Sequence, residues 1–441
     1  MARALAALLA VLVPCAPAPA AAPAGALRVG TSGDYAPFSI DVPGPPPLDG
    51  LDLALARAYA ESRGLRLELV RFAWPDLERR LAAGDFDVAM SGVTVRPDRS
   101  LVGRFTTPVA ESGAVVLVRE SASPPSLDDL GRPGITLAVN AGGHLERAAR
   151  ARFPAAAIRP LRDNAAVLGE LASGRADGAV TDTLEAPSWQ ARAPGLVAAG
   201  PFTRDRKAWL VRASAPELAA DLDTWLAAKE ADGSLAALRE RWLPPGARAA
   251  TAAPLPALVA AIDERFAVMP LVAEAKRKAG RPVRDAAQEA RVLEAAAADV
   301  ARAAAAAGRP APSQDCVTGL FRAQIDAGSS VQEAVLAGPA SAASPPDLDA
   351  TLRPALARIG SRIAAALIAW QEAPDRAVSR TREAPRPPAA AAGAGDGADS
   401  APAAREIRRE VTDGLRAPGI SSEAREAIAQ ALERCAQRDG R

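Results

Sequence analysis

The secondary-structure pattern of this chain changes near residue 254. Between Leu27 and about Leu243, short runs of β type (LRVG, LRLELV, FDVAMSG, GAVVLVR, ITLAVN, ADGAVT) alternate with helical segments such as LDLALARAYAES. This alternation predicts an α/β fold with largely parallel strands. From about Pro254 the β-type runs stop, and Ala-rich segments with helical periodicity follow, which predicts an all-α helical bundle. Because the halves differ in class, the sequence predicts a multidomain protein.

The length of 441 residues and the apolar content of 49% allow two sizeable cores. We expect an α/β domain over residues 26–245 and a helical domain over residues 256–441. The linker between them, residues 246–255, lies in the Pro- and Ala-rich stretch PPGARAATAAPLP, and residues 383–404 are a low-complexity insert. With 53 basic and 52 acidic residues, nothing global points to nucleic acid or to an anionic membrane as a partner.

Residues 1–22 have the pattern of a cleaved signal peptide: a basic residue at Arg3, an apolar stretch from Ala4 to Val13, and small residues at the end. We therefore expect a periplasmic or secreted protein with no membrane contact after cleavage. Cys316 and Cys435 would remain in an oxidising compartment, where they can pair; the alternative is two buried thiols, and the sequence leaves this open.

Polar clusters follow several of the predicted strands, at the edge where α/β domains bind ligands. They are GDYAPFS, SGVTVRPDR, NAGGHLE and TDTLE. Arg99 can hold a carboxylate in bidentate fashion, assisted by the Thr94 hydroxyl and the Gly92 amide, and the turn at Gly142–His144 opens a helix whose free N–H groups favour an anion. The alternatives are a solvated arginine and an ordinary helix start.

Together and in this order, these clusters resemble the periplasmic amino-acid-binding proteins of transporters. GLDLALARA, AAGDFDVAMSGVTVRPDR and GRADGAVTD carry the resemblance over roughly residues 27–244. It implies a type II periplasmic-binding-protein fold of two α/β lobes joined by a hinge. It also implies that Arg99 binds the ligand α-carboxylate and that Asp182 binds the α-ammonium.

More narrowly, the segments LRVGTSGDYAPFS, FAWPDL, VNAGGHLERAARARFP, TDTLEA and FTRDRKAWLVR are similar to the cyclohexadienyl dehydratases, an enzymatic branch of that scaffold. The resemblance makes Glu185 the general acid, and this suits the chemistry, because dehydration of prephenate requires a proton for the leaving hydroxyl. By the same resemblance Lys207 contacts a substrate carboxylate. Further substrate-binding candidates are Trp74, as a platform for the ring, and the turn residues Gly143 and His144, although a small hydroxyl residue is expected in place of the histidine.

The helical half carries charged residues at positions that share helix faces. Arg265 and Lys276 are eleven residues apart, close to three helical turns, so both can project on one face. Asp285 and Glu289 follow at i and i+4, and Gln332 and Arg362 lie on later helices. Spacing alone also fits charges on solvated faces.

The pattern resembles the secreted subclass of all-α chorismate mutases, most strongly in ERFAVMPLVAEAKRKAGRPVRDAAQEARVL and more weakly in FRAQIDAGSSVQEAV. The resemblance implies that Arg265 and Arg362 hold substrate carboxylates and that the catalytic Lys276 and Gln332 contact the ether oxygen. Asp285 and Glu289 would lie near the ring hydroxyl. Two positions depart from the family: Gln288 stands where an arginine is usual, and Gly328 where a hydroxyl residue is usual. The rearrangement needs no cofactor and no metal, only positioning and charge.

These resemblances predict a bifunctional exported enzyme that converts chorismate to prephenate, and prephenate or arogenate to phenylpyruvate or phenylalanine. The alternative is a mutase fused to a non-catalytic amino-acid-binding domain of a transporter or sensor, and a third possibility is a degenerate mutase domain. The expected partners are the small-molecule substrates, with no nucleic acid, and a dimer through the helical domain is possible. The sequence does not decide between prephenate and arogenate, nor does it establish the oligomeric state.

Overall fold

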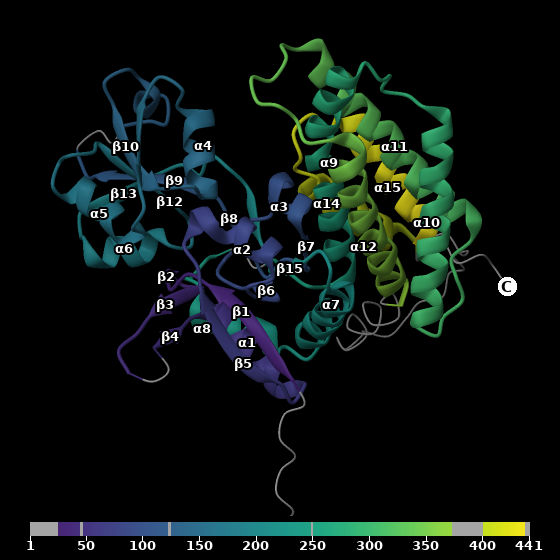
Figure 1. Ribbon diagram of the computed structural model, residues 1–441, viewed down its shortest axis with the longest axis horizontal. Coiled ribbons are helices and arrows are strands. Elements are labelled where there is room, and N and C mark those ends of the chain that lie inside the picture. Colours follow the sequence, from purple (N-terminus) through teal and green to yellow (C-terminus); the bar gives the residue numbers. More distant parts are fainter. Residues whose placement is uncertain (1–24, 45–46, 122–124, 248–249, 373–399, 437–441) are drawn as a thin grey trace, which may run out of the picture.

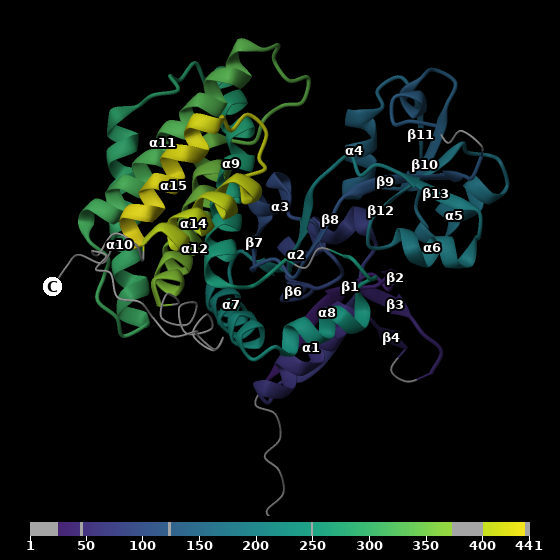
Figure 2. The same ribbon diagram turned by 180° about the vertical axis from the view of Figure 1, so that it is seen from behind.

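The computed structural model describes residues 25–44, 47–121, 125–247, 250–372 and 400–436. An α/β region and a helical region lie side by side (Figure 1), and the view from behind shows the same separation (Figure 2). The predicted signal peptide lies outside the described residues, as does most of the predicted insert. Helix α14, Ser400–Gly414, begins within the last five residues of the predicted insert.

The α/β region consists of two lobes, each built on a five-stranded sheet. In both sheets the fourth strand pairs antiparallel with the third and with the fifth, so the two lobes share this part of their topology. The first sheet has the order β5 (Arg66–Arg71), β1 (Ala26–Thr31), β6 (Val88–Ala89), β15 (Leu210–Arg212), β7 (Gly103–Phe105). The second has the order β11 (Ala157–Leu161), β10 (Thr136–Asn140), β12 (Gly178–Asp182), β9 (Ala114–Arg119), β13 (Leu196–Ala199).

Helices and short elements surround these sheets. The first lobe contains a small sheet of β2 (Asp34–Tyr35), β3 (Ser39–Asp41) and β4 (Leu48–Asp49), a 3-10 turn η1 (Trp74–Asp76), and the helices α1 (Leu51–Ser62), α2 (Leu77–Ala83), α3 (Pro97–Val102), α7 (Pro216–Ala231) and α8 (Ser234–Trp242). The second lobe contains η2 (Asp129–Gly131), α4 (His144–Arg152), α5 (Asn164–Ala172) and α6 (Ala186–Arg192).

Alternation along the strands gives each sheet two buried faces. In β9, Val115 and Leu117 pack with residues of α5 and α6, whereas Val116 and Val118 pack with residues of α4. Successive side chains of a strand point to opposite faces, so a continuous apolar run such as AVVLVR is what a sheet covered on both sides requires.

The chain crosses between the lobes twice, and the two crossings pair with each other. They form the antiparallel strands β8 (Ala110–Ser112) and β14 (Asp205–Lys207). This ribbon connects the two lobes. The carboxyl ends of β1, β6, β10 and β12 lead into the space between the lobes.

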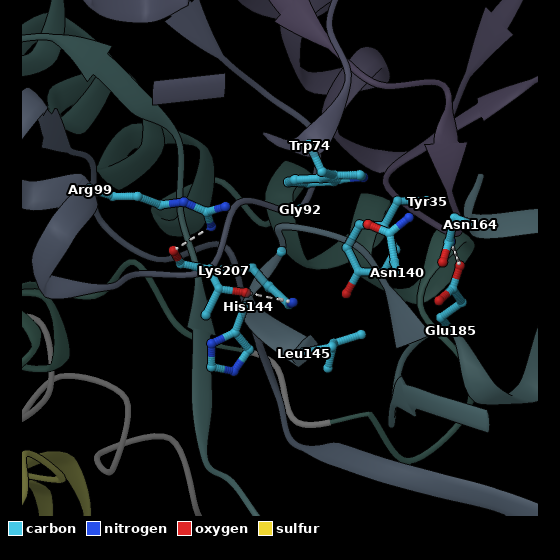
Figure 3. A pocket seen from close by; sticks show the side chains of 12 residues that line it. Tyr35, Trp74, Gly92, Arg99, Asn140, His144, Leu145, Asn164, Glu185 and Lys207 are labelled. Atoms are coloured by element: carbon cyan, nitrogen blue, oxygen red, sulfur yellow. Dashed lines mark hydrogen bonds between the residues drawn. The ribbon is translucent and has the colours of Figure 1, made fainter. Parts of the chain in front are cut away.

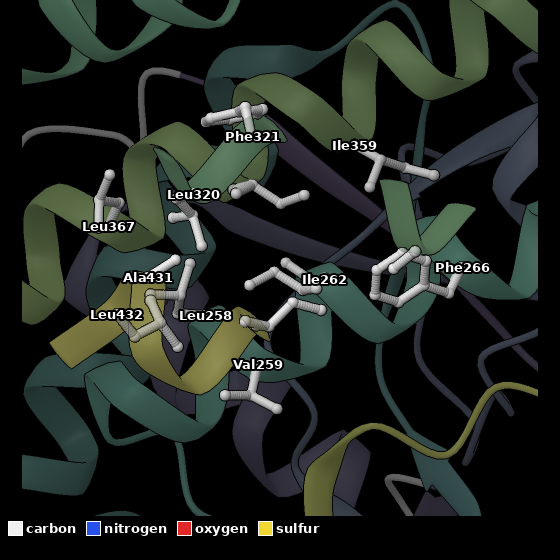
Figure 4. Close-up of a cluster of buried hydrophobic side chains, with 14 of the residues drawn as sticks. Leu258, Val259, Ile262, Phe266, Leu320, Phe321, Ile359, Leu367, Ala431 and Leu432 are labelled. Carbon is white, nitrogen blue, oxygen red and sulfur yellow. The ribbon is translucent and has the colours of Figure 1, made fainter. Parts of the chain in front are cut away.

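The helical region is built around its first helix, which packs against three others. Helix α9 (Pro254–Ala279) contacts α11 (Gln314–Ala337), α12 (Arg353–Glu372) and α14; it begins two residues before the predicted domain start at 256. The remaining elements are α10 (Ala286–Ala306), a π-helical turn η3 (Leu348–Leu352) and α15 (Ser422–Ala436). Figure 4 shows Leu258, Ile262 and Phe266 of α9 within the apolar core of this region.

A disulfide joins Cys316 of α11 to Cys435 of α15. The two cysteines that remain after the predicted cleavage are therefore paired, and the bridge closes a loop with a sequence separation of 119 residues. The alternative of two free buried thiols is wrong.

The two regions are joined by direct contacts as well as by the chain. Helix α3 packs against α9 and α12, and the guanidinium of Arg358 donates to the carbonyls of Ser100 and Leu101 at 3.2 and 2.8 Å. Asp263 of α9 pairs with Arg206 of β14 at 2.5 Å. The helical region thus contacts both the first lobe and the connection between the lobes.

Candidate functional sites

A pocket of about 420 Å³, including its open mouth, lies between the two lobes (Figure 3). Residues from both lobes and from the connecting strand β14 line it. They are Tyr35, Trp74, Gly92, Thr94, Arg99, Asn140, Gly143, His144, Leu145, Asn164, Glu185 and Lys207. In Figure 3 Arg99 lies at one end, Glu185 at the other, and Lys207 between them.

Arg99 is a buried cation with one free nitrogen. Its Nη1 donates to the Thr94 carbonyl and its Nε to Glu78, both at 3.0 Å, while Nη2 is buried without a hydrogen-bond partner among the described residues. Burial, followed by repulsion from Arg96, lowers the pKa of Arg99 to about 10, so the side chain stays charged at neutral pH. The free nitrogen can donate to an anionic ligand.

The predicted role of the Gly92 amide in holding a carboxylate is wrong. Its N–H donates to Oδ2 of Asp52 at 2.6 Å, and Asp52 also accepts from the Trp209 indole at 2.9 Å. Asp52 is fully buried, and burial raises its pKa to about 6. Gly92 has φ = +63°, and a Cβ there would clash with Tyr35, so the residue shapes the pocket wall rather than binding through its amide.

Asp182 forms an ion pair with Lys207, and both of its carboxylate oxygens have donors from the protein. Its Oδ2 is 3.0 Å from Lys207 Nζ and accepts a short hydrogen bond from the Tyr35 hydroxyl. Its Oδ1 accepts from the backbone amides of Leu184 and Glu185 at 2.9 and 3.0 Å. Both carboxylate oxygens are therefore engaged.

Glu185 has the environment of a protonated acid. It is 1% exposed; its Oε1 accepts from Asn164 at 2.8 Å and its Oε2 contacts the Thr181 hydroxyl at 2.7 Å. Burial, with a further contribution from the charge of Asp182, raises its pKa to about 8. No cation contacts it among the described residues. A carboxyl in this state can donate a proton at neutral pH.

His144 begins helix α4 and faces the connecting strand. Its Nε2 lies 3.0 Å from Oδ2 of Asp205 in β14. Burial alone would raise the pKa of Asp205, but the hydrogen bond from His144 and the nearby charge of Lys207 lower it overall. The side chain thus joins the second lobe to the strand that carries Lys207.

Trp74 borders the pocket from the first lobe. Its indole nitrogen donates to Asp34 at 3.1 Å, and its ring meets Tyr35 edge to face with centroids 5.9 Å apart. The Arg99 guanidinium lies 5.9 Å from the Trp74 ring centroid. The ring is thereby held in a fixed orientation on which an apolar ligand surface can pack.

Four lining residues, Leu145 among them, were not assigned from the sequence. Tyr35 and Asn140 belong to clusters that had been singled out, and Asn164 follows β11, whose sequence AIRPL was not recognised as a strand. Asn140 Nδ2 is buried and has no partner among the described residues. Recognising that strand would have drawn attention to Asn164.

In the helical region, Arg265 is a buried cation without a partner among the described residues. It is 9% exposed, burial alone lowers its pKa to about 10, and no hydrogen bond or ion pair to it occurs among the described residues. An isolated buried charge is costly, so the presence of Arg265 at this position points to an anion that it binds.

Two further candidate residues are Lys276 on α9 and Gln332 on α11. Burial lowers the pKa of Lys276, whose Nζ donates to the Val283 carbonyl at 2.6 Å. Gln332 contacts Met269, one turn after Arg265, and its Oε1 is buried without a partner among the described residues. A Cβ at Gly328 would meet the same methionine, so this departure makes room for its side chain.

The acidic pair lies at the start of α10. The Asp285 carboxylate caps that helix by accepting from the Gln288 amide at 3.0 Å, and Glu289 pairs with Arg322 at 3.1 Å. Both residues lie near Lys276, and their negative charges partly offset the lowering of its pKa by burial. The departure at Gln288 is not offset by Arg291, whose guanidinium bonds to the Gln288 side chain itself.

Arg362 does not have a free guanidinium. It forms a short ion pair with Glu264, which also accepts from the Ser100 hydroxyl of α3 at 2.7 Å. Burial raises the pKa of Glu264. Any role of Arg362 in holding a substrate carboxylate would require this pair to open or to share the arginine.

Sequence relatives identify the α/β region. The family described as bacterial extracellular solute-binding proteins, family 3, matches residues 27–245. A cyclohexadienyl dehydratase of Pseudomonas aeruginosa is 35% identical over 224 residues, which are 50% of this chain and 83% of that protein. The chain belongs to family 3 of the solute-binding proteins. An L-cystine-binding protein of Escherichia coli is 27% identical over 222 residues, covering 49% of this chain and 82% of the relative.

A second family matches part of the helical region of the chain. Chorismate mutase type II matches residues 256–333. Among solved structures, an ancestral amino-acid-binding protein, a precursor of cyclohexadienyl dehydratase, is 34% identical with a TM-score of 0.47, covering 50% of this chain and 96% of that one. The sequence matches confirm the predicted resemblances to the solute-binding proteins, the cyclohexadienyl dehydratases and the chorismate mutases, whereas the secreted subclass of mutases stays a prediction.

Within the described residues, no helix is long and apolar enough to span a membrane, and no cluster of His, Cys, Asp and Glu side chains is suited to a metal ion.

Proposed function

We propose that the chain is a bifunctional enzyme whose helical region rearranges chorismate to prephenate and whose interlobe pocket dehydrates and decarboxylates prephenate or arogenate. The observation that carries the proposal is Glu185: a buried carboxyl with a pKa of about 8 at the end of a cationic pocket. A protein that only binds amino acids has no use for such an acid beside Asp182.

For the dehydratase, the arrangement of the pocket matches the shape of the substrate. The side-chain carboxylate binds Arg99, the ring packs along Trp74, and the ring hydroxyl reaches Glu185 at the opposite end (Figure 3). Glu185 donates its proton to this hydroxyl and the C–O bond breaks. The ring C–C bond to the carboxylate then supplies the electron pair that makes the ring aromatic, releasing water and CO₂. Solvent reprotonates Glu185 after product release.

For the mutase, Arg265 binds a carboxylate of chorismate, and Lys276 and Gln332 stabilise charge on the ether oxygen as its C–O bond breaks. Support comes from the buried charge of Arg265, which has no partner among the described residues. The Nε2 group of Gln332 donates to the Gly328 carbonyl at 3.1 Å, and it would have to leave this carbonyl to donate to the ether oxygen. The rearrangement is unimolecular, so positioning and electrostatic stabilisation account for the whole effect of the protein. The roles of Asp285 and Glu289 near the ring hydroxyl belong to the same proposal.

A transported amino acid is less well supported as the ligand. That function requires a free carboxylate for the α-ammonium, and both oxygens of Asp182 are engaged by Lys207, Tyr35 and backbone amides. Membership of an exported family supports a periplasmic location. We also propose that residues 26–245 and 256–441 are separate folding units joined at 246–255.

Two variants of the full chain test the division of labour. Glu185→Gln is expected to lose dehydratase turnover while its mutase rate is unchanged, and Arg265→Met is expected to show the reverse. Because each variant is expected to keep one of the two activities, the activity that it keeps shows that the variant is folded. Loss of both activities in either variant, or loss of neither, would refute the assignment.

A further inference from the structure

We infer that the helical region serves the dehydratase reaction, because its residues position the two elements that carry the cations Arg99 and Lys207 of the interlobe pocket. Arg99 lies on α3 and Lys207 on β14, and both line that pocket. The positioning residues are Asp263 on α9 and Arg358 on α12, neither of which lines the pocket. The inference rests on the proposed dehydratase function, in which these cations bind an anionic substrate.

Strand β14 has one face toward the pocket and the other toward the helical region, because successive side chains of a strand alternate between faces. Lys207 lines the pocket, with Nζ 3.0 Å from Asp182 Oδ2 in the second lobe and 2.9 Å from Thr94 Oγ1 in the first. The neighbouring Arg206 points the other way and pairs with Asp263 at 2.5 Å. The ion pair with α9 therefore fixes the strand at the residue next to Lys207.

Further contacts hold the same face of the ribbon that β14 forms with β8. The guanidinium of Arg206 also donates to the carbonyl of Gly414 at 2.5 Å. Glu111 of β8 lies opposite Arg206 in the ribbon and pairs with Arg416 at 2.6 Å. Both crossings between the lobes are thus attached to the helical region on the face opposite the pocket.

Helix α3 is held by the helical region at the residues that follow Arg99. It packs against α9 and α12 (Figure 1, Figure 2). Arg358 donates to the carbonyls of Ser100 and Leu101 at 3.2 and 2.8 Å, and the Ser100 hydroxyl donates to Glu264 at 2.7 Å. The Leu101 side chain packs against the apolar core of the helical region. A shift of α3 against the helical region would therefore move the guanidinium of Arg99.

These contacts are expected to act on substrate binding more than on the proton transfer. The two cations lie away from Glu185, which is at the opposite end of the pocket from Arg99 (Figure 3). A group displaced by about 1 Å can cost about 100-fold, and residues that act through a chain of contacts have smaller effects. We therefore expect the loss of either contact to raise KM for prephenate about tenfold and to leave kcat within about twofold.

Asp263→Asn tests the contact to β14 in the full chain. Its side-chain oxygen can still accept from the amides of Arg416 and Ala417, whereas an amide group replaces the oxygen that pairs with Arg206. KM for prephenate should rise about tenfold, while the mutase rate stays within about twofold and shows that the helical region is folded.

Arg358→Met tests the contact to α3 and should have the same effect on KM, whereas Arg358→Lys keeps a donor for the carbonyls and should recover most of the loss. Glu433→Gln is the matched control, because it weakens an ion pair with Arg408 between α14 and α15, inside the helical region. It should change neither activity.

A double-mutant cycle separates positioning from a general loss of stability. If Asp263 acts through Arg206, then Arg206→Met should raise KM by a similar factor, and Asp263→Asn should add no further increase in that background. Two factors that multiply would contradict this path.

The outcomes distinguish the inference from the proposed function on which it rests. An unchanged KM in Asp263→Asn would overturn the inference for β14, and an unchanged KM in Arg358→Met would overturn it for α3; both results leave the dehydratase intact. Equal losses of both activities would show impaired folding instead of positioning and would also overturn it. No turnover of prephenate by the unmodified chain would overturn the proposed dehydratase together with the inference.

Discussion

Replacing Glu185 with glutamine should stabilise the protein at neutral pH while abolishing its dehydratase activity. Glutamine is isosteric with the protonated acid: its carbonyl can accept from Asn164, and its amide can donate to the Thr181 hydroxyl, so the contacts at 2.8 and 2.7 Å survive. The one property removed is ionisation. Activity and stability are therefore expected to change in opposite directions.

The size of the stability effect follows from the shift of the Glu185 pKa from 4.5 to about 8. A carboxyl whose folded-state pKa is raised contributes stability that is fully present below the unfolded value and is lost as pH rises through the folded value. Each pH unit in that window is worth about 1.4 kcal/mol. The free energy of unfolding of Glu185→Gln, relative to the unmodified chain, should thus rise by roughly 1.4 kcal/mol per pH unit between pH 5 and 8.

Denaturant titrations at several pH values measure this difference, with tryptophan fluorescence as the probe because five of the six tryptophans lie in the α/β region. Glu170→Gln is a control of opposite sign, since hydrogen bonding to Arg175 lowers the pKa of Glu170 and its loss should destabilise the protein at neutral pH. Dehydratase turnover in Glu185→Gln should fall by about 10² to 10⁴. A flat stability difference across pH 5 to 8, or activity within threefold of the unmodified chain, would refute the account of a desolvated acid.

Three further predictions concern other parts of the molecule. Arg265→Met should lower mutase turnover by about 10² or more while raising the free energy of unfolding, because it removes an unpaired buried charge; retained turnover would exclude the helical site. Reduction of the Cys316–Cys435 bridge should lower the free energy of unfolding of the helical region by about 2–5 kcal/mol in denaturant, and no change would mean that the bridge does not form. Asp263→Ala should cost about 3–5 kcal/mol in the same assay, because it leaves buried Arg206 without its carboxylate and the amides of Arg416 and Ala417 without their acceptor; a neutral result would show that the regions do not dock there.

The fold class could be predicted because its signals are local. Apolar runs in β9 and the helical periodicity of α9 depend on residues a few positions apart, and these patterns gave both fold classes correctly. The start of α14 inside the insert has no local signal, because its first residues, SAPAA, share the small-residue composition of the stretch before them.

Much of the interlobe pocket could also be predicted, because functional side chains follow the ends of parallel strands. What the sequence could not reveal is which polar groups satisfy one another. The engagement of Asp182 by Lys207 joins the end of β12 in the second lobe to the connecting strand β14. The pairing of Arg362 with Glu264 joins residues 98 positions apart on two helices. The use of the Gly92 amide by Asp52 is of the same kind, a long-range pairing with no local signature.

The central claim is that one chain carries both reactions, and incubation of the purified full chain with chorismate tests it most directly. The account predicts that chorismate disappears and phenylpyruvate accumulates, while the Glu185→Gln variant stops at prephenate. Chorismate that remains untouched would contradict the mutase assignment, and prephenate accumulating with the unmodified chain would contradict the dehydratase assignment.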